Sequence, residues 1–342
     1  MTVATNPLTD LLAEKGVLLA DGATGTNLFA MGLEAGEAPE LWNEQHPDRI
    51  TKLHQDFVDA GADIILTNSF GGTRHRLKLH NAQDRVHELN RKAAELATEV
   101  AKAAGRRVIV AGSVGPTGEL LEPLGALTYE GAVDAFAEQI AGLKDGGAEV
   151  AWIETMSAPQ EIRAAADAAI RVGLPYTYTG SFDTAGRTMM GLAPADIHGV
   201  AEGLPEKPVA VGANCGVGAS DILASLLDMT NADPEATIIV KGNCGIPEFR
   251  GSEIHYSGTP ELMADYVRLA VDGGAKIVGG CCGTSFAHLK AMREALDSHR
   301  KAARPTVADV VARIGPLRNK AANESGANAE GGSRRERRRA RA

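Results

Sequence analysis

Short apolar runs alternate with segments of helical periodicity along most of the chain. Eight runs end in glycine or small polar residues, as buried strands of a parallel sheet do, and they span 17–24, 62–69, 107–115, 148–155, 175–182, 209–215, 237–244 and 275–282. Between most of them, apolar side chains recur every three or four positions. This spacing predicts amphipathic helices at 83–104, 129–145, 158–172, 219–229, 259–272 and 285–302. Together the two patterns predict a parallel sheet covered by helices.

The number of strand–helix units favours one particular α/β fold. Eight units over roughly 300 residues predict a single (β/α)8 (TIM) barrel. The alternative is an open, doubly wound sheet, which a Gly-x-Gly-x-x-Gly turn after the first strand would favour. The turn here, DGATGTN at 21–27, lacks that glycine spacing. We therefore expect a barrel over residues 1–317, with a partly apolar extension at 299–317 that packs under the barrel or against another subunit of a homo-oligomer.

Composition narrows the possible partners and location. The net charge of −9 gives no reason to expect nucleic acid or an anionic membrane as a general partner. The chain lacks both a run of roughly 20 apolar residues and a signal-peptide pattern, so we expect a cytoplasmic protein. Residues 318–342 carry almost no large apolar side chains and end in RRERRRARA, which predicts a disordered basic tail. We interpret this run as solvated, with contact to an acidic partner or RNA as the alternative.

All four cysteines lie at the ends of predicted strands, and three of them belong to the sixth and eighth. Cys215 ends the sixth strand, and Cys281 and Cys282 end the eighth, so only one strand of a barrel separates them. Their thiols are expected to meet at the carboxyl ends of the strands, where barrels of this kind carry their chemistry. Three converging thiolates favour a zinc site with an open fourth position. Buried thiols without a metal are the alternative.

A zinc ion held by three thiolates favours one type of reaction. Such a centre is electron-rich and a poor Lewis acid for hydrolysis, but it can hold a substrate thiol as a nucleophilic thiolate. We therefore expect alkylation of sulfur. A zinc hydrolase would need a general base and a less electron-rich set of ligands. A non-catalytic barrel that binds zinc or senses thiols is a further alternative.

Six stretches of the sequence resemble a known family. They are DGATGT (21–26), AGADIILTNSFGGT (60–73), AGSVGPTGE (111–119), WIET (152–155), GANCGVG (212–218) and GGCCGTS (279–285). The chain resembles the zinc-dependent homocysteine S-methyltransferases over about residues 10–300. That family includes betaine–homocysteine methyltransferases and the homocysteine domain of methionine synthase. The resemblance implies a (β/α)8 barrel, a Zn²⁺ ion bound by Cys215, Cys281 and Cys282, and homocysteine as the methyl acceptor.

The resemblance also implies which residues bind homocysteine. Glu154 ends the fourth strand, where the family uses a carboxylate to bind the substrate ammonium group. Asp21 and Gly22 end the first strand, where the family contacts the amino acid. We further expect the backbone N–H groups of Ser113 and Gly115 to help receive the substrate carboxylate, as part of an anion nest.

Two residues beside the predicted metal site are harder to interpret. Asn243 matches an asparagine that some relatives offer as a resting fourth zinc ligand, but a structural role in its turn is equally compatible with the sequence. Cys244 follows the seventh strand, between the strands that carry the ligands. We expect it to be a buried thiol that does not bind the metal.

The methyl donor is the least determined part of the hypothesis. We expect a small onium donor, betaine or a relative such as dimethylsulfoniopropionate, ahead of S-methylmethionine and of a separate corrinoid protein. Aromatic faces bind onium cations, and the candidates are Trp42, Phe70, Tyr129, Tyr176, Tyr178, Phe182 and Tyr256. Gly71 and Ala38 stand where animal betaine enzymes carry aromatic residues, which argues against a directly shared betaine pocket.

Overall fold

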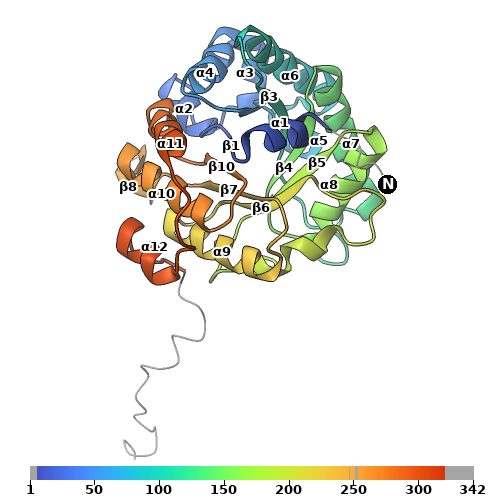
Figure 1. Ribbon diagram of the computed structural model, residues 1–342. Coiled ribbons are helices and arrows are strands. Elements are labelled where there is room, and N and C mark those ends of the chain that lie inside the picture. The colour runs from blue at the N-terminus through green and yellow to red at the C-terminus, as the bar shows by residue number, and fades with distance from the viewer. Residues whose placement is uncertain (1–5, 246, 251–252, 320–342) are drawn as a thin grey trace, which may run out of the picture.

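The computed structural model describes residues 6–245, 247–250 and 253–319. Eight parallel strands form one sheet in the order β1-β10-β7-β6-β5-β4-β3-β2. Their bounds are β1 Leu18–Leu19, β2 Ile64–Leu66, β3 Ile109–Val114, β4 Val150–Met156, β5 Tyr176–Gly180, β6 Ala210–Cys215, β7 Ile238–Gly242 and β10 Ile277–Gly280. A parallel bridge between Ala20 and Ile64 connects the two ends of this order. The sheet is therefore a nearly closed barrel surrounded by helices (Figure 1), which confirms the predicted (β/α)8 fold.

The helices agree with the six predicted from periodicity and include further ones. The α-helices are α1 Pro7–Lys15, α2 Gly25–Ala30, α3 Trp42–Gln45, α4 Pro47–Asp59, α5 Arg74–Leu77, α6 Val86–Ala103, α7 Tyr129–Asp145, α8 Pro159–Val172, α9 Ala219–Ala232, α10 Pro260–Asp272, α11 Phe286–Ser298 and α12 Val307–Ile314. Short 3₁₀ helices occur at η1 Pro39–Leu41, η2 Lys78–His80, η3 Gln83–Arg85 and η4 Pro194–Ala201. Between β5 and β6, η4 stands in place of an α-helix, and it contacts α8 and α9. None of the described helices is long and apolar enough to cross a membrane.

Local sequence explains where several helices begin. Thr128 and Thr259 accept hydrogen bonds from backbone N–H groups in the first turns of α7 and α10. Such caps satisfy N–H groups that have no partner within the helix. Proline occupies the first position of α4, α8 and α10, where its missing N–H group costs nothing.

Two elements near the barrel were not predicted from the sequence. Helix α1 closes the amino-terminal end of the barrel, because Leu8 and Leu11 pack against inward-facing strand residues such as Trp152. An antiparallel hairpin, β8 Pro247–Arg250 and β9 Glu253–Tyr256, lies in the chain between β7 and α10. The hairpin ends at Tyr256, which reaches the cavity at the carboxyl ends of the strands.

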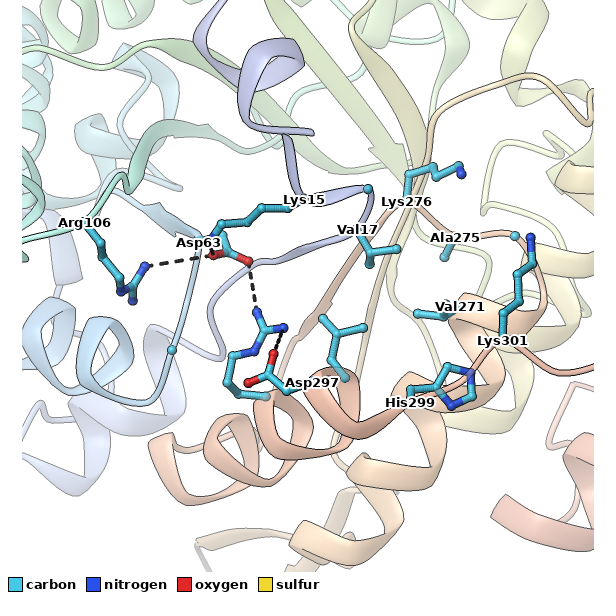
Figure 2. Close-up of a pocket in the computed structure, with 15 residues that line it drawn as sticks. Lys15, Val17, Asp63, Arg106, Val271, Ala275, Lys276, Asp297, His299 and Lys301 are labelled. Atoms are coloured by element: carbon cyan, nitrogen blue, oxygen red, sulfur yellow. Dashed lines mark hydrogen bonds and ion pairs between the residues drawn. The ribbon is translucent and has the colours of Figure 1, made fainter. Parts of the chain in front are cut away.

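At the amino-terminal end of the barrel, a buried carboxylate is surrounded by partly exposed cations (Figure 2). Asp63 is 1% exposed and lies 2.6 Å from the Lys15 ammonium, 3.2 Å from the Arg293 guanidinium and 4.0 Å from that of Arg106. Its second oxygen also accepts a hydrogen bond from the N–H group of Leu19. The carboxylate therefore joins the start of the barrel to α1, to α11 and to the loop before β3.

The carboxyl-terminal extension packs on the outside of the same chain. Helix α12 contacts α9 and α10 and buries Val310 completely. Arg318 and Asn319 were assigned to the tail from the sequence, yet their N–H groups donate to the Asp221 carboxylate of α9. The remainder of the predicted disordered tail, residues 320–342, lies outside the described residues.

The charge cluster leads to a prediction about stability. Asp63→Asn removes the negative charge that faces three cations, and it should lower the free energy of unfolding by about 2–3 kcal/mol. Urea denaturation of the purified variant measures this change. Lys276→Gln is the control, since this lysine is exposed at the same end of the barrel, and it should change stability by less than about 0.5 kcal/mol. Equal stability of the two variants would contradict the prediction.

Candidate metal and substrate site

Three cysteine thiols meet at the carboxyl-terminal end of the barrel. The sulfur atoms of Cys215, Cys281 and Cys282 all lie within 4.8 Å of one another. The sulfurs of Cys215 and Cys282 are 4.0 Å apart. Cys215 ends β6, while the other two follow β10, and β7 separates these strands in the sheet. The parallel topology thus brings together residues that are 66 or more positions apart in the sequence.

Backbone geometry and a buried asparagine orient the cluster. Cys215 has a φ of +62° and Thr155, at the end of β4, has a φ of +60°. Left-handed conformations cost a residue with a side chain roughly 1–3 kcal/mol, so the surroundings must enforce them. Asn214 does so for Thr155, because its oxygen accepts from the Thr155 N–H group at 2.7 Å and its nitrogen donates to the Thr155 hydroxyl at 2.7 Å. The same nitrogen lies 3.8 Å from the Cys281 sulfur.

The thiols influence one another strongly. Hydrogen bonding with Cys281 raises the pKa of the Cys215 thiol far above its usual value. Hydrogen bonding with Cys215 lowers the pKa of Cys282 to about 3. A cluster this tight ionises one thiol at the expense of its neighbours, because adjacent negative charges repel. All three can be thiolates together only when a cation lies among them, which is the chemistry of a metal site.

The geometry of the three sulfurs also suits zinc. A tetrahedral ion about 2.3 Å from each thiolate would place the sulfurs roughly 3.8 Å apart. The Cys215–Cys282 separation of 4.0 Å is close to that value, and the third sulfur is within 4.8 Å of both. Small side-chain rotations would therefore complete the set of ligands.

Cys244 and Asn243, which follow β7 beside the thiol cluster, differ in their capacity to bind a metal. Cys244 is completely buried outside the three-thiol group, and burial raises the pKa of its thiol to about 12. The Asn243 amide nitrogen donates to the Gly216 carbonyl at 2.8 Å. Its amide oxygen is buried without a hydrogen-bond partner among the described residues. That oxygen keeps the capacity to accept a hydrogen bond or to bind a metal.

The cysteines form part of the wall of a cavity of about 560 Å³ at the carboxyl ends of the strands. Of the substrate residues expected from the sequence, Gly22, Ser113 and Glu154 line this cavity, whereas Asp21 and Gly115 do not. Its volume lies within the usual range for small-molecule sites. A larger cavity, of about 700 Å³, lies at the opposite end of the barrel beside Asp63 and holds none of these residues (Figure 2).

Glu154 is a buried carboxylate of the cavity wall that keeps one oxygen available to a ligand. It is 7% exposed, and one of its oxygens accepts a hydrogen bond from the Ser113 hydroxyl at 2.6 Å. The other oxygen has no partner among the described residues. Burial raises the pKa of Glu154 to about 7, although the positive charge of Lys241 opposes this effect. The site therefore offers a carboxylate that a substrate cation would help to ionise.

Asp21 is paired with a lysine that sequence reasoning did not single out. The Lys241 ammonium lies 2.6 Å from one Asp21 oxygen, and both side chains are almost fully buried. The other Asp21 oxygen accepts the N–H group of Leu66 at 2.7 Å. The available signal was a lone charge near the end of an otherwise apolar strand, IIVKG at 238–242.

The expected anion nest is already engaged within the protein. The Ser113 N–H group donates to the Thr67 hydroxyl at 3.0 Å, and the Gly115 N–H group donates to the Phe70 carbonyl at 3.0 Å. A Cβ atom at position 115 would lie 2.6 Å from the Phe70 ring, so Gly115 makes room for that ring. Neither N–H group is therefore free to receive a substrate carboxylate.

Few of the candidate aromatic side chains reach the cavity. Phe70 and Tyr256 line it, together with Phe29, which the sequence analysis did not select. The other five do not line it: Trp42, Tyr176, Tyr178 and Phe182 are buried, and the Tyr129 hydroxyl donates to Asp167. Arg76 and His80 also line the cavity, and the Arg76 guanidinium gives part of its wall a positive charge.

Most of the chain is similar in sequence to one part of two curated methionine synthases. The chain is 29% identical to the methionine synthase of Mycobacterium tuberculosis over 306 residues, which cover 84% of this chain and 25% of that protein. For the methionine synthase of Mycobacterium leprae the identity is 27%, with the same coverage. The chain thus spans about a quarter of the length of these curated relatives.

Solved structures and a family match complete the comparison. The homocysteine methyltransferase MmuM of Escherichia coli is 26% identical in its oxidised form, with a TM-score of 0.71 and coverage of 85% of this chain and 99% of that one. Its metallated form matches with a TM-score of 0.70 at the same identity. Residues 18–296 match the homocysteine S-methyltransferase family. This match covers most of the sequence, and the barrel and the three-thiol cluster agree with it. The chain therefore belongs to the homocysteine S-methyltransferase family.

Proposed function

We propose that this protein transfers a methyl group to the sulfur of L-homocysteine, giving methionine, at a zinc ion bound by Cys215, Cys281 and Cys282. The observation that carries this proposal is the cluster of three thiols in the cavity wall that also holds Glu154. Family membership supports homocysteine as the acceptor. The existence of a metallated form of the related MmuM supports the binding of a metal by this protein.

The metal and the protein residues would have separate tasks. When bound, zinc would keep the homocysteine sulfur as a thiolate at a pH where free thiols are mostly protonated. The unpartnered oxygen of Glu154 would accept a hydrogen bond from the substrate ammonium group. The Ser113 hydroxyl, bonded to the first oxygen at 2.6 Å, would hold the carboxylate in that orientation. Asn214 would keep Cys215 and Cys281 in register.

The transfer itself is a displacement at carbon. The homocysteine sulfur forms a bond to the methyl carbon while the bond from that carbon to the donor's heteroatom breaks. The electron pair of the broken bond leaves with the heteroatom. The nitrogen or sulfur atom of an onium donor becomes uncharged as it leaves, so no acid needs to protonate it, and the site needs positioning more than proton transfer.

We propose a small onium compound as the donor, betaine or a relative such as dimethylsulfoniopropionate, with S-methylmethionine as the alternative. The cavity of about 560 Å³ has space for a donor of this size beside homocysteine, and Phe70 and Tyr256 offer aromatic faces. A separate corrinoid protein is a further candidate, favoured by the similarity to one quarter of the methionine synthases.

A donor panel tests this assignment. The zinc-loaded protein is incubated with homocysteine and, separately, betaine, dimethylsulfoniopropionate, S-methylmethionine or methylcobalamin, and methionine is measured. We expect methionine with at least one onium donor. Turnover with methylcobalamin alone would contradict a small donor, and no turnover with any donor would contradict the proposed reaction.

The metal site is tested by two cysteine substitutions. Cys215→Ala removes one of three ligands, so it should lose most of its zinc and more than about 100-fold in methyl transfer, because even residues that only support ligands cost 10–100-fold. Cys244→Ala is the matched control, and it should keep its zinc and its activity. Metal analysis and a methionine assay measure both effects. Zinc loss in the Cys244 variant, or full zinc retention in the Cys215 variant, would refute the assignment.

The raised pKa of Glu154 predicts a pH dependence of homocysteine binding. Below about pH 7 this carboxyl becomes neutral and cannot balance the substrate ammonium. The KM for homocysteine should therefore rise by up to about tenfold for each unit of pH below that value. Glu154→Gln should raise the KM by roughly 10–100-fold at pH 8 and remove this part of the pH dependence.

Other groups titrate in the same range of pH. The KM for homocysteine is therefore compared between the wild type and Glu154→Gln at each pH. Lys241 lowers the pKa of Glu154, while Cys281 and Asp21 raise it. Proton release from the homocysteine thiol affects the wild type and the Gln variant alike. Profiles that run parallel from pH 6 to pH 8 would exclude Glu154 as the group that binds ammonium.

A further inference from the structure

Lys241 is a buried cation in the cavity wall to which the proposed reaction assigns no task. Its side chain is 3% exposed, yet it lines the same cavity as Cys281 and Glu154. Burial by itself lowers the pKa of the Lys241 ammonium, but the negative charges of Asp21 and Glu154 outweigh burial and raise it. The residue therefore places a permanent positive charge next to the site of the acceptor.

The ammonium group has unused hydrogen-bonding capacity. A lysine ammonium carries three N–H donors. Among the described residues, only Asp21 accepts a hydrogen bond from it, at 2.6 Å. Leaving donors of a buried charged group without partners is costly. An anionic group of a ligand would satisfy the remaining donors.

The stem of the lysine is held in place by its neighbours in the sheet. Lys241 pairs in register with Gly279 of β10 on one side and with Asn214 of β6 on the other. A Cβ atom at position 279 would lie 3.0 Å from Cγ of Lys241, so the glycine makes room for the stem. The ammonium is therefore fixed on the strand that lies between those bearing the thiols.

Glu154 and Lys241, two polar groups of the cavity wall that lie within electrostatic range of Cys281, form a complementary pair. Arg76 and Glu40 of the same wall act on each other instead. Both oxygens of Asp21 are engaged, one by Lys241 and the other by Leu66. Glu154 keeps one oxygen without a partner, and Lys241 keeps unused N–H donors. One free carboxylate oxygen and one free ammonium group match the ammonium and carboxylate groups of an α-amino acid. The N–H groups of Ser113 and Gly115, which the sequence suggested as receptors for the carboxylate, are engaged elsewhere, and the Arg76 guanidinium of the same wall faces the charge of Glu40.

We propose that Lys241 is a specificity residue that binds the α-carboxylate of the thiol acceptor, while Glu154 binds its ammonium group and Asp21 acts as a positioning residue for the lysine. This inference rests on the proposed function and narrows the acceptor to thiols that are also α-amino acids. An acceptor without the carboxylate would leave the lysine unsatisfied and should react poorly.

Two acceptors that differ only in the α-carboxylate test the proposal. L-Homocysteine is compared with 3-aminopropane-1-thiol, which has the same thiol and amine but no carboxylate. The full-length, zinc-loaded protein is used with a saturating donor. The wild type should favour homocysteine by about 10–100-fold in kcat/KM, as expected for a charge-assisted contact. Lys241→Gln should bring this ratio close to 1 by raising the KM for homocysteine, with little change for the amine thiol.

Control variants separate recognition from structural support. Lys276→Gln changes an exposed lysine at the other end of the barrel and should leave the ratio unchanged. Because Lys241→Gln leaves Asp21 buried without its counter-ion, the double variant Asp21→Asn/Lys241→Gln is measured as well. Zinc content and thermal unfolding show which of the variants are folded. An equal loss for both acceptors in a folded variant would mean a purely structural ion pair and would overturn the proposal.

The proposal for Lys241 can be tested independently of the proposed methyl transfer. Wild-type methionine formation alone decides whether the reaction is methyl transfer to homocysteine. If it fails, affinities for the two thiols are measured by titrating the cobalt-substituted protein and following its sulfur-to-cobalt absorption. A preference for homocysteine that disappears in Lys241→Gln supports carboxylate binding even then, and an unchanged preference refutes it.

Discussion

Mutual repulsion among three thiolates is the constraint on which the site depends. Cys215, Cys281 and Cys282 are held within 4.8 Å of one another, where they cannot all ionise unless a cation lies between them. The protein keeps them together by means of strand topology and a left-handed turn at Cys215. A cation that neutralises the cluster would also give it its chemistry, because a metal surrounded by thiolates holds a further thiol readily and activates water poorly.

The remainder of the cavity is organised around a second set of charges. Asp21, which follows β1, forms a buried ion pair with Lys241 of β7, two strands along the sheet, and Glu154 lies within range of the same lysine. In this arrangement Asp21 is committed to the protein, while Glu154 and Lys241 each keep bonding capacity for a ligand. Such a division gives the site a polarity that can orient an amino acid, with the thiol cluster fixed on neighbouring strands. The opposite end of the barrel carries its own cluster of charges around the buried Asp63, which supports the fold (Figure 2).

Much of this organisation could be predicted from sequence, because alternation of buried strands and amphipathic helices is a strong local signal. The meeting of Cys215 with the Cys281–Cys282 pair followed once the strands were placed in a barrel. Lys241 was missed because its partner, Asp21, is 220 positions away, and a lone charge in an apolar strand gives no hint of its pairing. The partners of the Ser113 and Gly115 N–H groups, Thr67 and Phe70, were also missed, because periodicity does not reveal such contacts. The sequence also did not show which of the aromatic side chains are buried in the core and which line the cavity.

The most direct test of the central claim is zinc X-ray absorption on the loaded protein, with and without homocysteine. Without substrate, the spectrum should show three sulfur atoms at about 2.3 Å and one oxygen or nitrogen atom. With homocysteine, it should show four sulfur atoms at about the same distance, because the substrate thiolate takes the fourth position. A spectrum that keeps three sulfur atoms while methionine is being formed would contradict activation of homocysteine by the three-cysteine zinc centre.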